Sequence, residues 1–156
     1  MERSASDLAL LIGRVALAAL FIPAGLSKLT NLAGFAESLE KRGVPLADVL
    51  APIGAGIEFF AGIAVLVGFQ TRIAAVLMIL FTVAATFIAH RFWEFEGAAR
   101  TTQQSQFFKN FAIVGGYVVL LVSGPGRYSI DRLLHRRHIG AERRVGERRQ
   151  TALSRT

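Results

Sequence analysis

The segment from Leu50 to Gly68 reads LAPIGAGIEFFAGIAVLVG. Its composition suits the interior of a lipid bilayer, yet Glu58 places a carboxylate near its middle. An ionisable group in hydrocarbon is costly unless another polar group or water satisfies it. The rest of the chain must therefore supply a partner, and the basic side chains available for this are Arg14, Lys28 and His90.

Three further apolar segments of similar length flank this one, separated by turn-forming residues. A helix of a soluble bundle carries a polar stripe at helical period, whereas these segments are apolar all round. The sequence therefore predicts an all-α fold, a bundle of four transmembrane helices. The predicted spans are Leu8–Leu29, Leu46–Val67, Ile73–Ala89 and Phe107–Val122.

The connections between the spans differ in character. The link from Thr30 to Pro45 places Phe35 and Leu39 one helical turn apart, which predicts a short helix at the membrane interface. The segment Gly68–Arg72 is long enough only for a tight turn, so the second and third spans are antiparallel neighbours. The segment Glu94–Ser105 is polar, and we expect it to form a loop.

The composition indicates a membrane protein with a basic tail. Hydrophobic residues make up 53% of the chain and the mean hydropathy is +0.46, which is too high for a soluble globule with 19% charged residues. Because arginine gathers near the C-terminus, we expect residues 1–132 to form the membrane domain and residues 133–156 a disordered tail. This placement of positive charge predicts that both termini are cytoplasmic.

The tail itself allows two interpretations. It could bind anionic lipid at the membrane surface, or it could serve only to keep the chain soluble and set its topology. Nucleic-acid binding is not expected, because no aromatic residue is interleaved with the arginines to stack on bases.

Arg14 and Glu58 are the first candidate pair inside the bundle. At about 1.5 Å per residue, Arg14 lies ~9 Å into the first span and Glu58 ~14 Å into the second, close enough for their side chains to meet. Such a pair is either a structural ion pair that fixes helix register or one wall of a polar pocket.

Lys28 and His90 lie near the outer ends of their spans. A lysine there extends its ammonium to the interface by default, and a histidine at a helix end is commonly solvated. Together with Arg14 and Glu58, they could instead form an intramembrane polar pocket that binds a quinone head group or an anion.

The sequence predicts no metal site and shows no catalytic constellation. His135 and His138 flank Arg136 and Arg137, whose charges repel a cation, and His90 is predicted to lie across the membrane from both. The chain has no cysteine, so it forms no disulfide or iron–sulfur cluster of its own. No cofactor is evident, and a quinone is the one bound ligand that we consider.

Several short motifs occur together along the chain. They are Arg14, Gly25-Leu26-Ser27-Lys28, Glu58 with Gly62, Gly68 to Ala75, His90, Lys109-Asn110, and Gly124 to Asp131. Their combination resembles the DoxX family of small bacterial four-helix membrane proteins. The resemblance implies a multi-pass protein of the bacterial inner membrane. It also implies a link to membrane redox systems, including those that handle thiol or oxidative stress.

The last of these motifs, GPGRYSID, also has a physical meaning. Its glycines and proline end the fourth span, after which Ser129 or Asp131 can cap a short helix. Arg72 lies in a turn on the same side of the membrane, so we predict that Arg72 and Asp131 form a clasp.

Three classes of function remain open from the sequence. The first is an accessory subunit of a redox system, whose partner protein brings the cofactor and whose polar pocket binds a quinone. The second is a carrier or channel that uses Glu58 and Arg14 and forms a homo-oligomer to complete its path. The third is a scaffold that anchors soluble partners through the tail.

Overall fold

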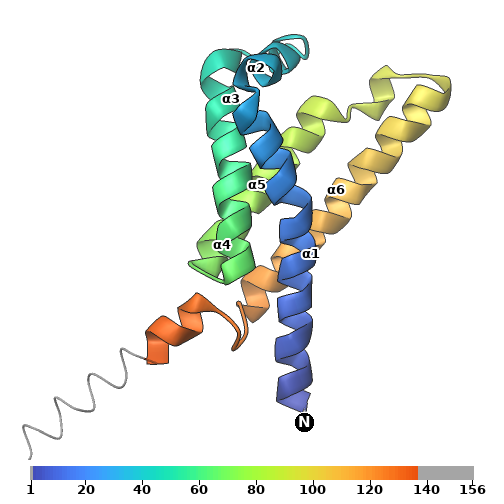
Figure 1. Ribbon diagram of the computed structural model, residues 1–156. Helices are drawn as coiled ribbons and strands as arrows, with labels where there is room; N and C mark the ends of the chain where they lie inside the picture. Colours follow the sequence, from blue (N-terminus) through green and yellow to red (C-terminus); the bar gives the residue numbers. More distant parts are fainter. Residues whose placement is uncertain (1, 137–156) are drawn as a thin grey trace, which may run out of the picture.

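The chain folds as an upright bundle of helices (Figure 1). The computed structural model describes residues 2–136, and no strand occurs among them. Four helical stretches are long and apolar enough to cross a membrane, namely Ser4–Thr30, Ala47–Val67, Thr71–Glu94 and Gly97–Ser123. The prediction of an all-α, four-span fold is confirmed.

The second span is built from three helical pieces, whereas the other spans are formed around one long helix each. The long helices are α1 (Glu2–Thr30), α5 (Thr71–Ala89) and α6 (Gly97–Ser123). The pieces of the second span are α3 (Ala47–Gly56), the π-helix η1 (Ile57–Ala61) and α4 (Gly62–Val67). The remaining elements are α2 (Leu32–Glu40) and the short 3-10 helix η2 (Phe92–Glu94).

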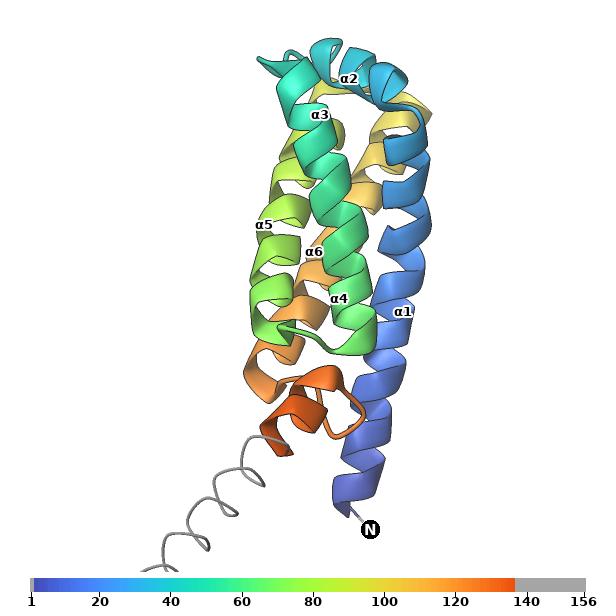
Figure 2. The same ribbon diagram turned by 60° about the vertical axis from the view of Figure 1, so that its left-hand side comes forward.

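The α2 helix lies across the upper end of the bundle as it is drawn in Figure 2. Asn31 caps its start, because the Asn31 side chain accepts a hydrogen bond of 3.2 Å from the backbone N–H of Gly34. The predicted short helix between the first two spans is therefore confirmed.

The polar loop predicted for Glu94–Ser105 is wrong from Gly97 onward, where α6 has already begun. This stretch contains two alanines, two glutamines and one arginine, which favour helix even when they face water. With 27 residues, α6 is about 40 Å long, more than the ~30 Å of a bilayer's hydrocarbon core. Its polar first turns therefore extend beyond the apolar part of the span.

Two glycines allow the first and second spans to pack closely. A Cβ atom on Gly25 would lie 2.7 Å from the backbone nitrogen of Phe59, and one on Gly62 would lie 3.2 Å from Ile22. The backbones of α1 and η1 can approach this closely only because Gly25 has no side chain. The first two spans are therefore in closest contact at η1 and the start of α4.

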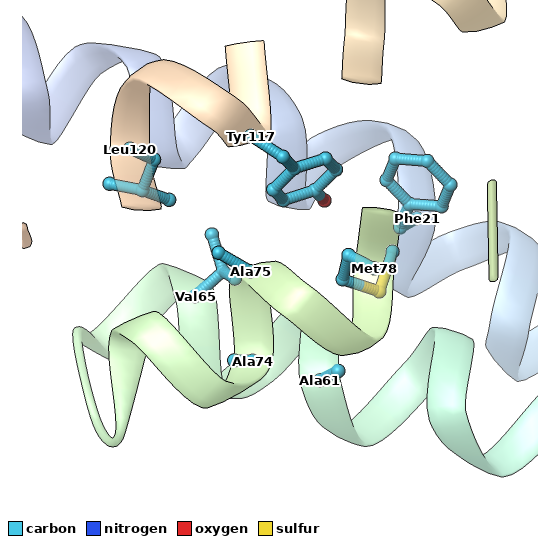
Figure 3. Close-up of a cluster of buried hydrophobic side chains, with 8 residues drawn as sticks. All are labelled: Phe21, Ala61, Val65, Ala74, Ala75, Met78, Tyr117 and Leu120. Carbon is cyan, nitrogen blue, oxygen red and sulfur yellow. The ribbon is translucent and has the colours of Figure 1, made fainter. Parts of the chain in front are cut away.

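The apolar core lies in the middle and lower part of the bundle and joins all four spans (Figure 3). Met78 and Tyr117 are fully buried there, and the ring of Phe21 lies 5.8 Å from that of Tyr117. The core consists of Phe21, Ala61, Val65, Ala74, Ala75, Met78, Tyr117 and Leu120.

The chain returns across the lower end of the bundle after α6. Residues 130–136 are helical, and the Ser129 hydroxyl caps them by accepting a hydrogen bond of 3.3 Å from the N–H of Arg132. The predicted cap is confirmed for Ser129. Residues 133–136 of the predicted tail belong to this helix, and residues 137–156 lie outside the described part. The N-terminus of α1 lies at the same lower end (Figure 2), while its cytoplasmic placement stays a prediction.

Candidate functional site: a charged pair in an apolar cavity

Glu58 lies inside the bundle, on the π-helical piece of the second span. It is only 3% exposed. A π-helix is a local widening of the helical turn that is rare in proteins and frequent at functional sites. In this chain it coincides with both the close approach of Gly25 and the buried carboxylate.

The partner of Glu58 is Lys28, which lies in the last turn of α1. The Lys28 ammonium donates a hydrogen bond to Oε2 of Glu58, and the two groups form an ion pair. The Lys28 side chain is 31% exposed and that of Glu58 only 4%. The ammonium also lies over two aromatic rings, 5.4 Å from the centroid of Phe35 and 5.9 Å from that of Phe81.

This ion pair borders a cavity of about 600 Å³ in the upper half of the bundle. The cavity is mostly apolar, and its wall comes from four spans and from α2. Among the predicted site residues, Lys28, Glu58 and His90 all line it. The structure thus brings three of the four predicted pocket residues to one cavity.

Arg14 is the exception, and its predicted pairing with Glu58 is wrong. Arg14 is 1% exposed and donates a hydrogen bond to the backbone carbonyl of Tyr128 at the lower end of the bundle. Its guanidinium lies so close to Gly68 that a Cβ atom there would collide with it. Gly68 is ten residues beyond Glu58, or about 15 Å along the span.

The error came from the assumed start of the first span. The helix α1 begins at Glu2 rather than at Leu8 and extends below the other spans (Figure 1). Arg14 therefore lies level with the turn between α4 and α5, and Lys28, much farther along α1, reaches the height of Glu58.

One wall of the cavity carries polar side chains from α5 and α6. His90 is hydrogen-bonded through Nδ1 to Oε1 of Gln103 at 2.8 Å. One turn below, the Asn110 amide donates to the Thr86 hydroxyl at 3.0 Å, and that hydroxyl donates to the carbonyl of Thr82 at 2.6 Å. The His90–Gln103 and Asn110–Thr86 bonds hold the end of α5 against α6 near the cavity.

The predicted clasp at the lower end forms around Asp131, but Arg72 is not the partner that the structure gives it. The Asp131 carboxylate accepts hydrogen bonds from the N–H of Gln70 at 2.8 Å, from the N–H of Thr71 at 3.0 Å and from the Thr71 hydroxyl at 2.8 Å. Asp131 also donates its own N–H to the Gly68 carbonyl at 2.9 Å. The carboxylate therefore caps α5, whose unpaired N–H groups and positive end attract an anion more directly than one flexible arginine does.

Comparison with known proteins supports the family that the motifs suggested. The DoxX family model matches residues 9–91, which include Arg14, Lys28, Glu58 and His90. The chain belongs to the DoxX family. No solved structure gives a significant match to it.

Two relatives of this DoxX protein are inner membrane proteins of Escherichia coli. YqjF is 37% identical over 131 residues, covering 84% of this chain and 95% of YqjF. YphA is 34% identical over 129 residues, covering 83% and 92% of the two chains. An uncharacterised membrane protein of Mycobacterium tuberculosis is 32% identical over 111 residues, 63% of each chain. With four apolar spans and these relatives, the chain is a multi-pass protein of the bacterial inner membrane.

Sequence reasoning missed two residues that shape the site. Phe35 was used to predict a helix, but its position one turn after Asn31 also folds it back over Lys28. Thr82 gave no signal, because one threonine in an apolar span is unremarkable in the sequence. Only the cavity and the bonding of its neighbours single it out.

Proposed function

We propose that this DoxX protein is an accessory subunit of a membrane redox system and that its cavity binds a quinone or a similar small aromatic molecule. The observation that carries the proposal is the ion pair of Lys28 and Glu58 at the wall of an otherwise apolar cavity. Charged groups within a membrane span are expensive and mark functional sites more often than not.

The size and lining of the cavity suit a ring with polar substituents. Sites for small molecules have volumes of about 300–1,000 Å³, apolar walls and a few convergent polar groups. In this cavity the ammonium of Lys28 can donate to a carbonyl oxygen of the ligand, and the Glu58 carboxylate can accept from a hydroxyl. Phe35 and Phe81, which both line the cavity, offer apolar surface to the ring.

The arrangement of the outer helices suits a ligand that arrives from the bilayer. Leu20 and Ala24 of α1 line the cavity on one side, and Lys109 and Asn110 of α6 line it on another. These two helices diverge toward the upper end of the bundle (Figure 1). We propose that a membrane-soluble ligand reaches the cavity between them and leaves its chain in the lipid.

The proposal assigns electron transfer to a partner protein. Among the described residues, no group of three or more histidine, cysteine, aspartate or glutamate side chains could hold a metal ion. In this scheme the present chain binds and orients the ring, and the partner supplies the redox cofactor. The proposal also includes binding of anionic lipid by residues 133–156 and a homo-oligomeric state.

The carrier alternative would need Glu58 and Arg14 on one path. Arg14 does not line the cavity, and the core around Met78 and Tyr117 fills the bundle between the ion pair and the lower end. The geometry therefore favours a binding cavity over a path through a single chain.

The test uses the full chain in lipid nanodiscs with a fully substituted para-benzoquinone, which has no free ring position for addition to lysine. Binding is followed by calorimetry for the wild type, Lys28→Gln, Glu58→Gln and Arg14→Gln. We expect at least about tenfold weaker binding for the first two variants, since a hydrogen bond to a charged group contributes about 1.5–3 kcal/mol. Arg14→Gln is the control for altered buried charge and should keep the affinity of the wild type.

A folded wild type that binds no quinone would refute the proposal. Equal losses in all three variants would show that the charges act on folding rather than on a site. Solute flux into proteoliposomes that depends on Glu58 would instead support the carrier.

A further inference from the structure

Thr82 lies in the cavity wall and has a hydroxyl with no hydrogen-bond partner. The residue is 2% exposed, and its Oγ1 atom is enclosed. A buried hydroxyl without a partner is unfavourable, so such a group in a native structure requires an explanation.

Four other threonines in the helices make a hydrogen bond that Thr82 does not make. Thr30, Thr86, Thr101 and Thr102 each donate to the carbonyl four residues earlier, as threonine in a helix commonly does. For Thr82 that acceptor would be the carbonyl of Met78, and no such bond forms. The Thr82 side chain therefore lines the cavity with a hydroxyl that is enclosed and has no partner.

We propose that Thr82 determines the specificity of the cavity by binding a second polar atom of the ligand. This inference rests on the proposed function. The Lys28–Glu58 pair, from α1 and η1, binds one oxygen of the ring, and Thr82, from α5, binds another. The ligand is accordingly a ring with two oxygen substituents on opposite sides, as in a para-quinone, rather than a ring with one.

The movement required of Thr82 is small. Threonine in a helix divides between two staggered positions of χ1, and rotation by about 120° exchanges the hydroxyl with the methyl group or the hydrogen. Because Thr82 lines the cavity while its hydroxyl is enclosed, binding a ligand oxygen requires this rotation to turn the hydroxyl toward the cavity. The rotation breaks no hydrogen bond, since the enclosed hydroxyl makes none.

Thr86 provides a matched control. It lies one turn farther along α5 and is as buried as Thr82, at 3% exposure. Its hydroxyl, however, is already engaged with the Thr82 carbonyl and the Asn110 amide. Replacing either threonine by valine keeps the shape of the side chain and removes only the hydroxyl.

The experiment compares the full chain in nanodiscs as wild type, Thr82→Val, Thr82→Ser and Thr86→Val, with two probes. The first probe is a fully substituted para-benzoquinone. The second is the matching cyclohexadienone, in which a dimethyl carbon replaces one carbonyl. We expect Thr82→Val to weaken quinone binding about 3- to 10-fold, the range for one neutral hydrogen bond, and to leave dienone binding within about twofold. Thr82→Ser should retain the preference for the quinone, and Thr86→Val should not change the ratio of the two affinities.

Two results would overturn the inference. One is an equal effect of Thr82→Val on both probes, including no effect, because the hydroxyl would then not bind the second oxygen. The other is a loss of preference in Thr86→Val as large as in Thr82→Val, because the cause would then be repacking of α5. If the wild type binds neither probe, the proposed function itself fails. If binding depends on Lys28 and Glu58 but not on Thr82, only the present inference fails.

Discussion

Replacing Asp131 by alanine should release the segment that closes the lower end of the bundle. The Asp131 carboxylate accepts three hydrogen bonds at 2.8–3.0 Å, from the N–H groups of Gln70 and Thr71 and from the Thr71 hydroxyl. It is the only side chain in the described residues that caps α5, since Gln70 at the helix start makes no capping bond of its own. The start of α5 therefore depends on this one carboxylate, which also ties the returning segment to the turn before α5.

The size of the effect follows from two contributions. Loss of a helix cap costs about 1 kcal/mol, with a range of 0.5–2. Thr71 is fully buried, so its hydroxyl would be left without a partner at a further cost of about 1–3 kcal/mol. Because Asp131 is itself partly exposed, water can replace part of its contribution. We therefore expect the free energy of unfolding to fall by about 2–3 kcal/mol.

Equilibrium unfolding in mixed micelles measures this change, and hydrogen exchange of residues 124–136 shows whether the segment has been released. Arg72→Gln is the matched control, since Arg72 lies beside Thr71 but makes no recorded bond to Asp131. We expect Arg72→Gln to leave the free energy of unfolding nearly unchanged. In a Thr71→Val background, Asp131→Ala should cost less by at least about 1 kcal/mol, because no hydroxyl is then left unpaired. An Arg72→Gln effect as large as that of Asp131→Ala would refute this reasoning and restore the arginine clasp.

Two further predictions concern the contact between the first two spans. Gly25→Ala should destabilise the bundle by about 2 kcal/mol, because its Cβ would meet the Phe59 backbone at 2.7 Å. The Cβ of Gly13→Ala would meet nothing within 4 Å, so this control should stabilise α1 by up to about 1 kcal/mol. Thermal melting measures both changes, and equal effects of the two variants would contradict the prediction. Lys28→Met should cost about 3 kcal/mol by leaving Glu58 buried and unpaired, and Lys28→Met with Glu58→Met should restore most of that loss. A double variant no more stable than Lys28→Met alone would contradict this, because the unpaired Glu58 carboxylate would then not be the source of the loss.

The number and class of the helices could be predicted because hydropathy acts on whole segments, and four long apolar stretches have few other ways to fold. The exact height of each residue along the bundle could not be predicted, because the sequence does not show how far a helix extends beyond the membrane. Arg14 illustrates this limit: its depth was measured from Leu8, while α1 begins at Glu2 and places it level with Gly68. A predicted contact between two helices depends on the predicted heights of both residues. When one height is wrong by a few helical turns, the predicted partner is the wrong residue.

The buried carboxylate was the more reliable signal, because the free-energy cost of burying Glu58 does not depend on which residue of a neighbouring helix lies beside it. Glu58 required a cation wherever it lay, and Lys28 supplied it. The role of Asp131 was found only in part, because its motif indicated a cap but the capped helix was a different one. Sequence spacing identifies a cap for the helix that directly follows the capping residue. It does not indicate a cap for a helix that is distant in the sequence.

The two charged clusters divide the bundle into parts that differ in how freely they can move. At the lower end, Asp131 ties the returning segment to the turn between α4 and α5, and Arg14 ties the same segment to α1. The apolar core lies directly above. At the upper end, the cavity replaces core packing, and Lys28 and Glu58 provide the main polar contact between the first two spans. Local opening is easiest where apolar contacts are few. A ligand that fills the cavity would therefore stabilise the upper half most, and hydrogen exchange should slow in α2 and the upper part of α5 on binding while the lower end stays unchanged.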